Sequence, residues 1–225
     1  MLTANSILFS TAYLPPIEYF VAFLKTNIPL LEIHEHFKRR SYSNHCLIAN
    51  VSGPHQLTIP VTKTCPNHCP IKDIRIDYSE KWQHTHWKTL ETSYNKSPFF
   101  LYYKDYFEPF YTKKIPYLLD YNLQLFDVVC NLLKIKHRFT TTNSYINPTS
   151  DNLIDVRESI DLKKRTLPDY PFKNMQAYRQ VFEDKTGFIP NLSIIDLLFN
   201  KGAQTKDYLM QHLHLLSLLN QSYIN

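Results

Sequence analysis

Apolar residues recur along this chain in two patterns: short continuous runs in the first third and helical periods thereafter. Residues 6–12 form an apolar run that stops at Pro15 and Pro16, which predicts a short buried strand and a tight loop. Residues 17–25 follow the helical period, and residues 29–36 begin a second strand. This order predicts an α/β unit, in which the loop after the first strand is a common ligand position.

Two further strands are predicted over residues 44–51 and 55–61, joined by a glycine turn into a β-hairpin. Residues 71–78 place Ile74 and Ile76 on one face, which predicts a half-buried strand. The first third of the chain is therefore expected to be rich in strands.

Helical periods dominate the rest of the chain. They predict helices over residues 79–95 (with Ser79 as N-cap), 101–111, 116–135, 174–182, 193–200 and from Thr205 onward. Residues 137–173 lack this periodicity, which predicts a long loop region with one ordered piece near residues 153–160. A loop of this length is a lid, a binding loop or a partly disordered segment. We expect a mixed α/β fold, strand-rich in its N-terminal third and helical in its C-terminal two-thirds, as a single domain over residues 1–225.

The segment Gly187–Gly202 (GFIPNLSIIDLLFNKG) is bracketed by two of the three glycines in the chain. Ser193 and Asp196 have the spacing of a capping box, and Gly202 is placed for a C-terminal cap. Asn191 adds a third polar residue to a helix N-terminus that is otherwise apolar. This trio has a structural interpretation, but such a helix end also holds anions.

Composition narrows the classes of function. The formal net charge is +5, and the Lys38-Arg39-Arg40 triplet is either a solvated face or a phosphate-binding patch. The three glycines cannot form a glycine-rich nucleotide loop, and no nucleic-acid recognition pattern accompanies the basic residues. No apolar run is long enough to insert into a membrane, and the N-terminus lacks the features of a signal peptide, so we expect a cytoplasmic protein.

Cys65 and Cys69 flank a histidine, which raises the possibility of zinc. No second pair of ligands follows, so no metal site is predicted and the two cysteines are expected to be free thiols.

Three groups of polar residues are candidates for a site. His34, Glu35 and His36 are adjacent, and they can line one pocket only if the preceding strand has already ended. His86 lies on the apolar face of its helix, and Asn122 lies within an apolar stripe. Each candidate also has an ordinary structural interpretation. Residues 34–36 are then a polar edge, His86 is a core histidine, and Asn122 is a buried amide that forms structural hydrogen bonds.

Five stretches of this chain together match the pattern of one known family: Thr11 to Pro16 with Tyr19 and Phe20; Tyr42 to Cys46; Trp82, His86, Tyr94 and Ser97 to Phe100; Asn122; and Gln180 to Phe182 followed by Gly187–Gly202. On these stretches the chain resembles the WbqC-like protein family over most of its length. Many members have Gln-Pro where this chain has Thr11-Ala12, and Asn-Arg where it has Asn44-His45, although Arg39 or Arg40 could replace that arginine.

The resemblance implies transfer of a glycyl or other acyl group onto a sugar in surface polysaccharide (O-antigen-like) biosynthesis. The partner would be an activated acyl or aminoacyl donor or a nucleotide-linked sugar, and the resemblance does not identify a cofactor. We expect His86 as general base and Asn44 and Asp196, at the start of the 193–200 helix, as further catalytic residues. The residues expected to bind substrate are Tyr13, Tyr19, Arg39, Tyr94, Asn122, Asn191 and Ser193.

The alternative is a binding or scaffold protein of a polysaccharide assembly system, without catalysis. Geometry distinguishes the two hypotheses. Convergence of His86, Asn44 and the start of the 193–200 helix on one solvent-reachable pocket favours the enzyme, whereas separate burial of each favours the scaffold.

Overall fold

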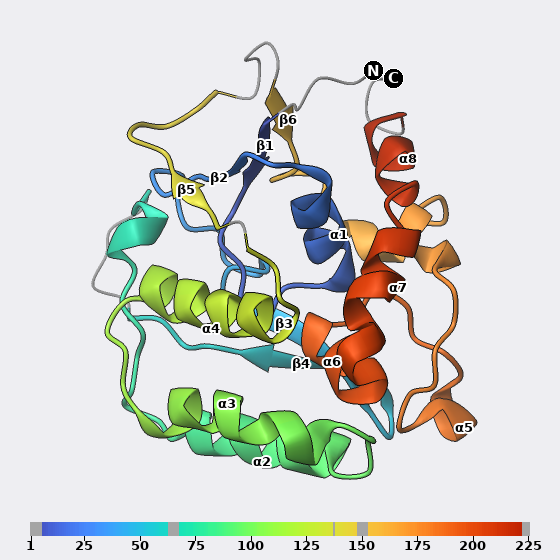
Figure 1. The fold of residues 1–225 in the computed structure, drawn as a ribbon. Helices are drawn as coiled ribbons and strands as arrows, with labels where there is room; N and C mark the ends of the chain where they lie inside the picture. The colour runs from blue at the N-terminus through green and yellow to red at the C-terminus, as the bar shows by residue number, and fades with distance from the viewer. Residues whose placement is uncertain (1–5, 63–67, 137, 148–152, 222–225) are drawn as a thin grey trace.

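The computed structural model describes residues 6–62, 68–136, 138–147 and 153–221, with the side chains of 219–221 excluded. A parallel sheet has the strand order β5-β2-β1-β6 and lies at the top of the molecule in Figure 1. In register, Leu8 on the central strand pairs with Leu30 on one side and Asp155 on the other. The strands are β1 (Ser6–Phe9), β2 (Pro29–Leu31), β5 (Thr140–Thr141) and β6 (Leu153–Asp155).

The first crossover confirms the predicted strand, loop, helix and strand. Helix α1 (Ile17–Lys25) begins directly after Pro16, as the fixed φ of proline favours, and its first seven residues are all buried. Strand β2 ends at Leu31, five residues before the end of the predicted strand. Glu32 N still donates to Phe9 O over 2.9 Å, and residues 33–36 lie outside the sheet.

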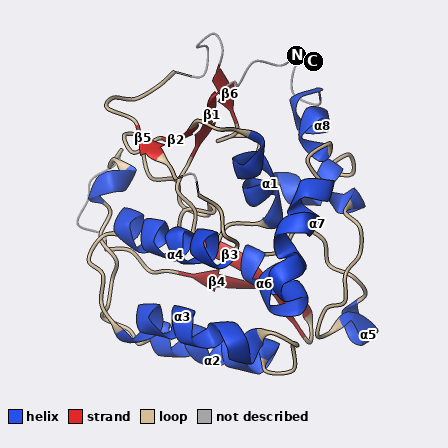
Figure 2. Cartoon of the chain, viewed as in Figure 1, coloured by secondary structure: helices blue, strands red, loops and turns tan. Residues whose placement is uncertain are grey.

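The predicted β-hairpin is confirmed as β3 (His45–Asn50) and β4 (Gly53–Thr58), which pair antiparallel in the middle of the molecule (Figure 2). The strand predicted over 71–78 is wrong. Residues Ile71–Asp73 form the 3-10 helix η1, and the extended residues after it make only isolated bridges. No neighbouring strand of the described chain offers this segment a continuous ladder.

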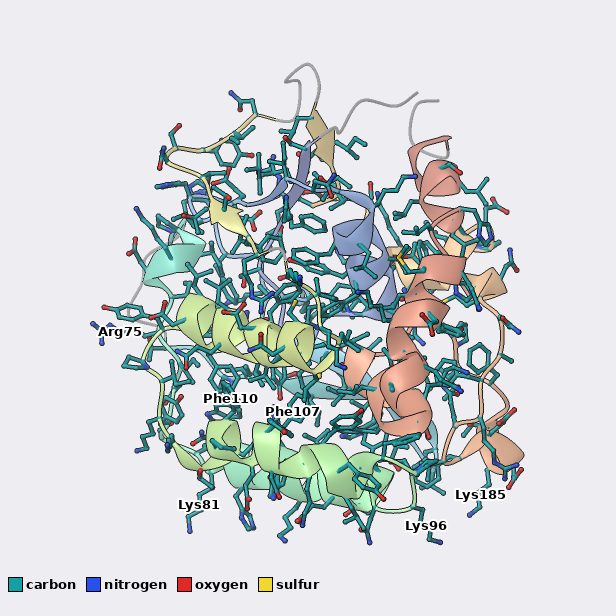
Figure 3. The ribbon with its side chains drawn as sticks, in the orientation of Figure 1. Arg75, Lys81, Lys96, Phe107, Phe110 and Lys185 are labelled. Atoms are coloured by element: carbon teal, nitrogen blue, oxygen red, sulfur yellow. The ribbon has the colours of Figure 1, made fainter. Side chains whose placement is uncertain are left out.

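Helices α2 (Trp82–Tyr94) and α3 (Phe100–Thr112) form the lower layer of the molecule, and α4 (Leu118–Leu132) crosses its middle (Figure 1). Figure 3 shows Phe107 and Phe110 pointing toward α4, and Lys81 and Lys96 pointing to solvent. Ser79 is not the N-cap of α2, because the helix begins three residues later, after Lys81. The backbone N–H of Ser79 instead donates to Asp77 Oδ1 over 2.8 Å in a local turn.

The region 137–173 is more ordered than a loop. It supplies the edge strands β5 and β6 and the 3-10 helices η2 (Lys164–Thr166) and η3 (Pro171–Asn174). The ordered piece predicted near residues 153–160 is confirmed by β6. Residues 148–152 lie outside the described ranges.

The helix predicted over residues 174–182 is wrong. Its residues run extended up to 180, and the short helix α5 (Glu183–Thr186) follows. Tertiary hydrogen bonds take the backbone groups that a helix would use, since Gln176 N donates to His212 Nε2 over 3.0 Å. Tyr178 and Gln180 likewise turn their side chains to a buried carboxylate.

Helix α6 (Ile194–Lys201) begins at the predicted N-cap, where Ser193 Oγ accepts from Ile195 N. The capping box is incomplete, because the Asp196 carboxylate bonds to other side chains. Gly202 terminates α6 with φ 56°. The single helix predicted from Thr205 is divided into α7 (Thr205–Gln211) and α8 (Leu215–Gln221), after the 3-10 helix η4 (Gly202–Gln204).

One hydrophobic cluster extends from Ile7 to Leu215. The single domain over residues 1–225 stays a prediction. Aromatic side chains from different elements meet in it, with ring centroids 4.8 Å apart for both Phe20 and Phe23 against Phe126. The mixed α/β class is confirmed, with helices mainly in the C-terminal part. Among the described residues, no helix has the length and apolar character needed to cross a membrane.

Gly202→Ala should destabilise the protein more than Gly187→Ala does. Both glycines have positive φ, but a Cβ at Gly202 would lie 2.7 Å from the Phe99 ring, whereas a Cβ at Gly187 meets nothing within 4 Å. We expect the difference in unfolding free energy, measured with urea, to be about 1–3 kcal/mol from overpacking. Equal losses for the two variants would contradict the tight packing of Gly202 on Phe99.

Candidate functional site

The candidate site lies where the parallel strands end. Ser10 follows β1 directly, Glu35 lies four residues after β2, and Arg157 lies two residues after β6. All three line the same cavity. Because the carboxyl ends of parallel strands meet at one edge of a sheet, this edge is where α/β folds bind ligands.

The cavity has an inner and an outer part. The inner part measures about 40 Å³, room for one small polar group, and includes Ser10, Tyr19, Tyr42 and Asp161 in its lining. The outer part is an open cleft of about 520 Å³. Glu35, His36, Lys38 and Arg157 line both parts. Because these four residues are shared, the two spaces adjoin.

The early end of β2 gives the cleft its polar wall. His34, Glu35 and His36 all line the outer cleft, because they follow the strand and no longer alternate between its faces. His34 is held on both sides, with its backbone N–H donating to Glu32 Oε1 over 2.8 Å and its Nε2 lying 3.1 Å from Thr142 O.

Glu35 is the group in the cleft best suited to proton transfer. Burial raises the pKa of its carboxyl from 4.5 to about 7, and hydrogen bonding by Ser10 and the charges of Arg157 and Lys38 only partly offset this rise. At neutral pH the carboxyl therefore populates both its protonated and its ionised form. A general base or acid needs this property.

The two cations of the cleft are held by carboxylates. Arg157 Nη2 lies 2.7 Å from Asp155 Oδ2 and donates over 2.9 Å to Ile146 O. Lys38 is paired with Glu158. These ion pairs hold Lys38 and Arg157 in place near Glu35. They also neutralise much of the positive charge that the two cations bring to the cleft.

Of the residues predicted to bind substrate, Tyr19 lines this cavity, and its hydroxyl donates to Ser10 O over 2.7 Å. Arg39 is exposed on the segment that follows Lys38, beyond the cleft. Asn122 lines a separate small cavity that also includes Tyr19. The remaining predicted residues line neither part of the candidate site.

His86 and Tyr13 form one buried group with Tyr111. The Tyr13 hydroxyl lies 3.1 Å from His86 Nδ1 and 3.0 Å from the Tyr111 hydroxyl, and Tyr13 has no exposed surface. Burial lowers the pKa of His86 to about 4, despite an opposing backbone hydrogen bond at Thr58. The ring is neutral at pH 7 and is a weak base.

Asp196 and Tyr94 belong to a second buried group. The Asp196 carboxylate accepts from Tyr94 over 2.9 Å, from Tyr178 over 2.6 Å and from Gln180 over 2.9 Å. Burial raises the pKa of Asp196, and these three hydrogen bonds oppose the rise. Every donor is supplied by the protein itself, so this network ties α2 and the extended 175–180 segment to α6.

Asn44 and Asn122 each join neighbouring chain segments. Asn44 Nδ2 donates to Ile59 O over 2.9 Å, and Asn122 Nδ2 donates to Ser43 O over 2.7 Å. Asn191 Oδ1 accepts from Glu18 N in the first turn of α1 over 2.9 Å, and Ser193 Oγ donates to Leu14 O in the loop before α1 over 2.8 Å. The structure therefore does not bring His86, Asn44 and Asp196 together on one pocket.

The sequence contained part of the signal for the cleft. Glu35 lay within a recognised polar cluster, but Ser10 and Arg157 were missed. Ser10 lies inside the strand predicted over residues 6–12, and only the observed end of β1 at Phe9 places it after the strand. Arg157 follows β6, which the sequence predicts only as an ordered piece.

No group of three or more metal-ligating side chains occurs in the part of the chain that the structure describes. Cys69 is disulfide-bonded, so its expected free thiol is wrong, and Cys65 lies outside the described residues. Cys46 and Cys130 are free and buried.

Asp196→Ala should destabilise the protein by roughly 3 kcal/mol or more, because it leaves three buried donors without their acceptor. Asp105→Ala, on the exposed face of α3, should change the unfolding free energy by less than about 0.5 kcal/mol. Urea unfolding measures both. A fully stable Asp196→Ala variant with a specific chemical defect would contradict the structural role.

Glu18 generates a second prediction. It is fully buried, neither of its carboxylate oxygens has a hydrogen-bond partner among the described residues, and burial raises its pKa from 4.5 to about 8. Since the unfolded carboxyl ionises near pH 4.5, wild-type stability should fall as the pH rises from there through 8. Glu18→Gln should flatten this part of the stability profile, whereas Glu108→Gln, exposed on α3, should reproduce the wild-type slope.

Comparison with known proteins places the chain in a family. The model of the WbqC-like protein family matches residues 11–169, which include Tyr19, Glu35 and Arg157 but end before α6. A protein from Mycobacterium tuberculosis, named uncharacterized protein Rv1507c, is 26% identical over 197 residues, covering 77% of this chain and 83% of the relative. No solved structure matches the chain. Because the family model spans well over half of its residues, this chain belongs to the WbqC-like protein family.

Proposed function

We propose that this chain transfers a glycyl or other acyl group onto a sugar during the biosynthesis of a surface polysaccharide of the O-antigen type. Membership of the WbqC-like family suggests an association with polysaccharide biosynthesis. The observation that carries the proposal is the Glu35 carboxyl, which has a pKa of about 7 and lines a sugar-sized cleft at the carboxyl ends of the parallel strands.

In the proposed reaction, Glu35 acts as the general base. Its carboxylate takes the proton from the sugar group that attacks the acyl carbon, a new bond forms from that group to the carbon, and the bond to the leaving group breaks. The protonated Glu35 then returns the proton to the leaving group. This role belongs to Glu35 because His86 is buried with a pKa of about 4.

The proposed partner is either an activated acyl or aminoacyl donor or a nucleotide-linked sugar that acts as the acceptor. Arg39 is exposed directly after Lys38, which lines the cleft, and its guanidinium suits bidentate contact with a phosphate at the rim. Tyr19 would position the acceptor from the inner cavity. A catalytic role for His86, Asn44 or Asp196, substrate binding by the other buried residues and a cytoplasmic location remain predictions from the sequence.

The second candidate is a binding or scaffold protein of a polysaccharide assembly system. The separate burial of His86, Asn44 and Asp196, each with its own protein partners, favours this candidate. It would use the same cleft to hold a glycan without reacting with it.

Glu35→Gln should lower the rate of acyl transfer by about 10²-fold or more, because the amide cannot accept the proton. The wild-type rate should increase with pH up to about 7 and then level, since the base must be ionised. Glu108→Gln, remote on α3, is the matched control and should retain the wild-type rate and profile.

The readout is the mass of the surface glycan in cells that lack the protein and are complemented with each variant. Loss of one acyl or glycyl group with Glu35→Gln, and its presence with Glu108→Gln, is the expected result. An unchanged glycan mass in cells without the protein would reject the transferase and favour the scaffold.

A further inference from the structure

Tyr145 gives the outer cleft an apolar ring within a wall of polar groups. It lies in the segment between β5 and β6 and lines the cleft. The seven other residues that line the cleft, among them Glu35 and His36, carry carboxyl, imidazole, ammonium or guanidinium groups. Tyr145 is 49% exposed, although a tyrosine ring gains free energy when another apolar surface covers it. The cleft therefore offers one ring surface to a ligand.

Buried charged groups fix the loop that carries Tyr145. The backbone N–H of Ile146, the next residue, donates to Glu32 Oε2 over 2.8 Å, and its carbonyl accepts from Arg157 Nη2 over 2.9 Å. Earlier in the loop, Thr142 Oγ1 donates to Glu32 Oε1 over 2.9 Å. The side chains of Glu32 and Arg157 are only 0% and 4% exposed. Because buried ions are stable only with such bonds, the two side chains and the loop hold one another in place.

The ring itself rests on the same guanidinium. Arg157 Cζ lies 5.2 Å from the centroid of the Tyr145 ring, within the range of a cation–π contact. Arg157 is in turn fixed by Asp155, with Nε donating to Oδ1 over 3.0 Å and Nη2 donating to Oδ2 over 2.7 Å. A binding surface that is ordered before its ligand arrives loses less free energy on binding. Tyr145 is therefore a preorganised surface in the cleft.

The charges of the outer cleft favour a neutral ligand over a phosphate. Its two permanently charged cations are already paired, Lys38 with Glu158 and Arg157 with Asp155. A phosphate would have to compete with these carboxylates for each cation. Hydroxyl groups, by contrast, can donate to the carboxylates and accept from the cations without breaking the pairs.

We propose that Tyr145 is the positioning residue on which the acceptor sugar stacks, and that the outer cleft binds this sugar as a neutral pyranose. A pyranose has a flat face of C–H bonds, which suits an aromatic ring, and a rim of hydroxyl groups, which suits the polar wall. The inference rests on the proposed function for the sugar's role as acceptor, but on Tyr145 and the paired charges for its binding mode. Since Glu35 lines the same cleft, a sugar on Tyr145 is held beside the proposed general base.

Saturation-transfer NMR on the full chain tests this binding mode. The probes are methyl β-D-glucopyranoside and methyl β-D-galactopyranoside, with sorbitol as an open-chain comparison that has hydroxyl groups but no flat apolar face. At least one glycoside should bind, and the ring protons on one of its faces should receive the most saturation. Absence of binding by both glycosides, equal saturation of both faces, or equally strong binding of sorbitol would overturn the inference.

Variants of Tyr145 locate the contact. Tyr145→Ala should weaken glycoside binding by about tenfold, as the loss of an aromatic contact at the centre of a binding site does. Because the residue is half exposed, the variant should retain nearly the wild-type unfolding midpoint. Tyr145→Phe keeps the ring and should retain most of the affinity. Tyr102→Ala, which removes a 75% exposed ring on α3, is the matched control and should bind like the wild type.

Two results with these variants would reject the stacking surface. The first is wild-type glycoside affinity in Tyr145→Ala. The second is tighter binding of uridine monophosphate than of either glycoside, with that binding lost in Tyr145→Ala, because it would assign the ring to a nucleobase.

The acyl content of the glycan separates this inference from the function on which it rests. In complemented cells, Tyr145→Ala should lower the fraction of glycan that carries the acyl group, and Tyr145→Phe should restore it. Wild-type acylation with Tyr145→Ala would reject the stacking surface while acyl transfer stands. Glycoside binding that depends on Tyr145, in cells whose glycan never carries the acyl group, would reject the transferase while the stacking surface stands.

Discussion

The fold depends on one set of hydrogen bonds between the loop that precedes α1 and the segment that begins α6. Ile17 N donates to Leu192 O over 3.0 Å, and Ile194 N donates to Pro15 O over 2.8 Å. Ser193 Oγ adds a bond of 2.8 Å to Leu14 O. These buried groups cannot bond to water, so the two ends of the chain must meet for either segment to be stable.

The same contact reaches the hairpin and the cleft. Ser193 N donates to Leu47 O over 2.8 Å, which attaches β3 to the start of α6. The loop that is held in this way leads back to Ser10 at the end of β1, on the wall of the cavity. Packing around Gly187–Gly202 therefore supports the position of a site to which that segment contributes no side chain.

The structure contains two kinds of carboxylic acid away from bulk solvent, and they differ in their hydrogen bonding. Asp196 is surrounded by donors from Tyr94, Tyr178 and Gln180, and this saturation makes it a stabilising element. Glu35 has few partners and faces a cavity, so its carboxyl keeps an exchangeable proton. The difference in hydrogen bonding, and not the residue type, distinguishes the structural carboxylate from the reactive candidate.

Local patterns predicted the elements whose stability is local. The 17–25 helix, the glycine-turned hairpin and the helix capped by Ser193 all have their termination signals in adjacent residues, and the structure contains each of them. Prediction failed where long-range partners decided the conformation. Residues 174–182 have a helical pattern, but His212, Tyr208 and Asp196 draw them into an extended path.

The sequence alone determined the mixed α/β class, the family and the polar cluster at residues 34–36. Only the tertiary structure decided that this cluster lines a cleft, because that required β2 to end at Leu31 and residues beyond β1 and β6 to converge on it. Strand ends are set by pairing between distant segments, such as Leu8 with Leu30 and Asp155. Spacing along the chain records which residues are polar, but the register of distant strands decides which of them meet.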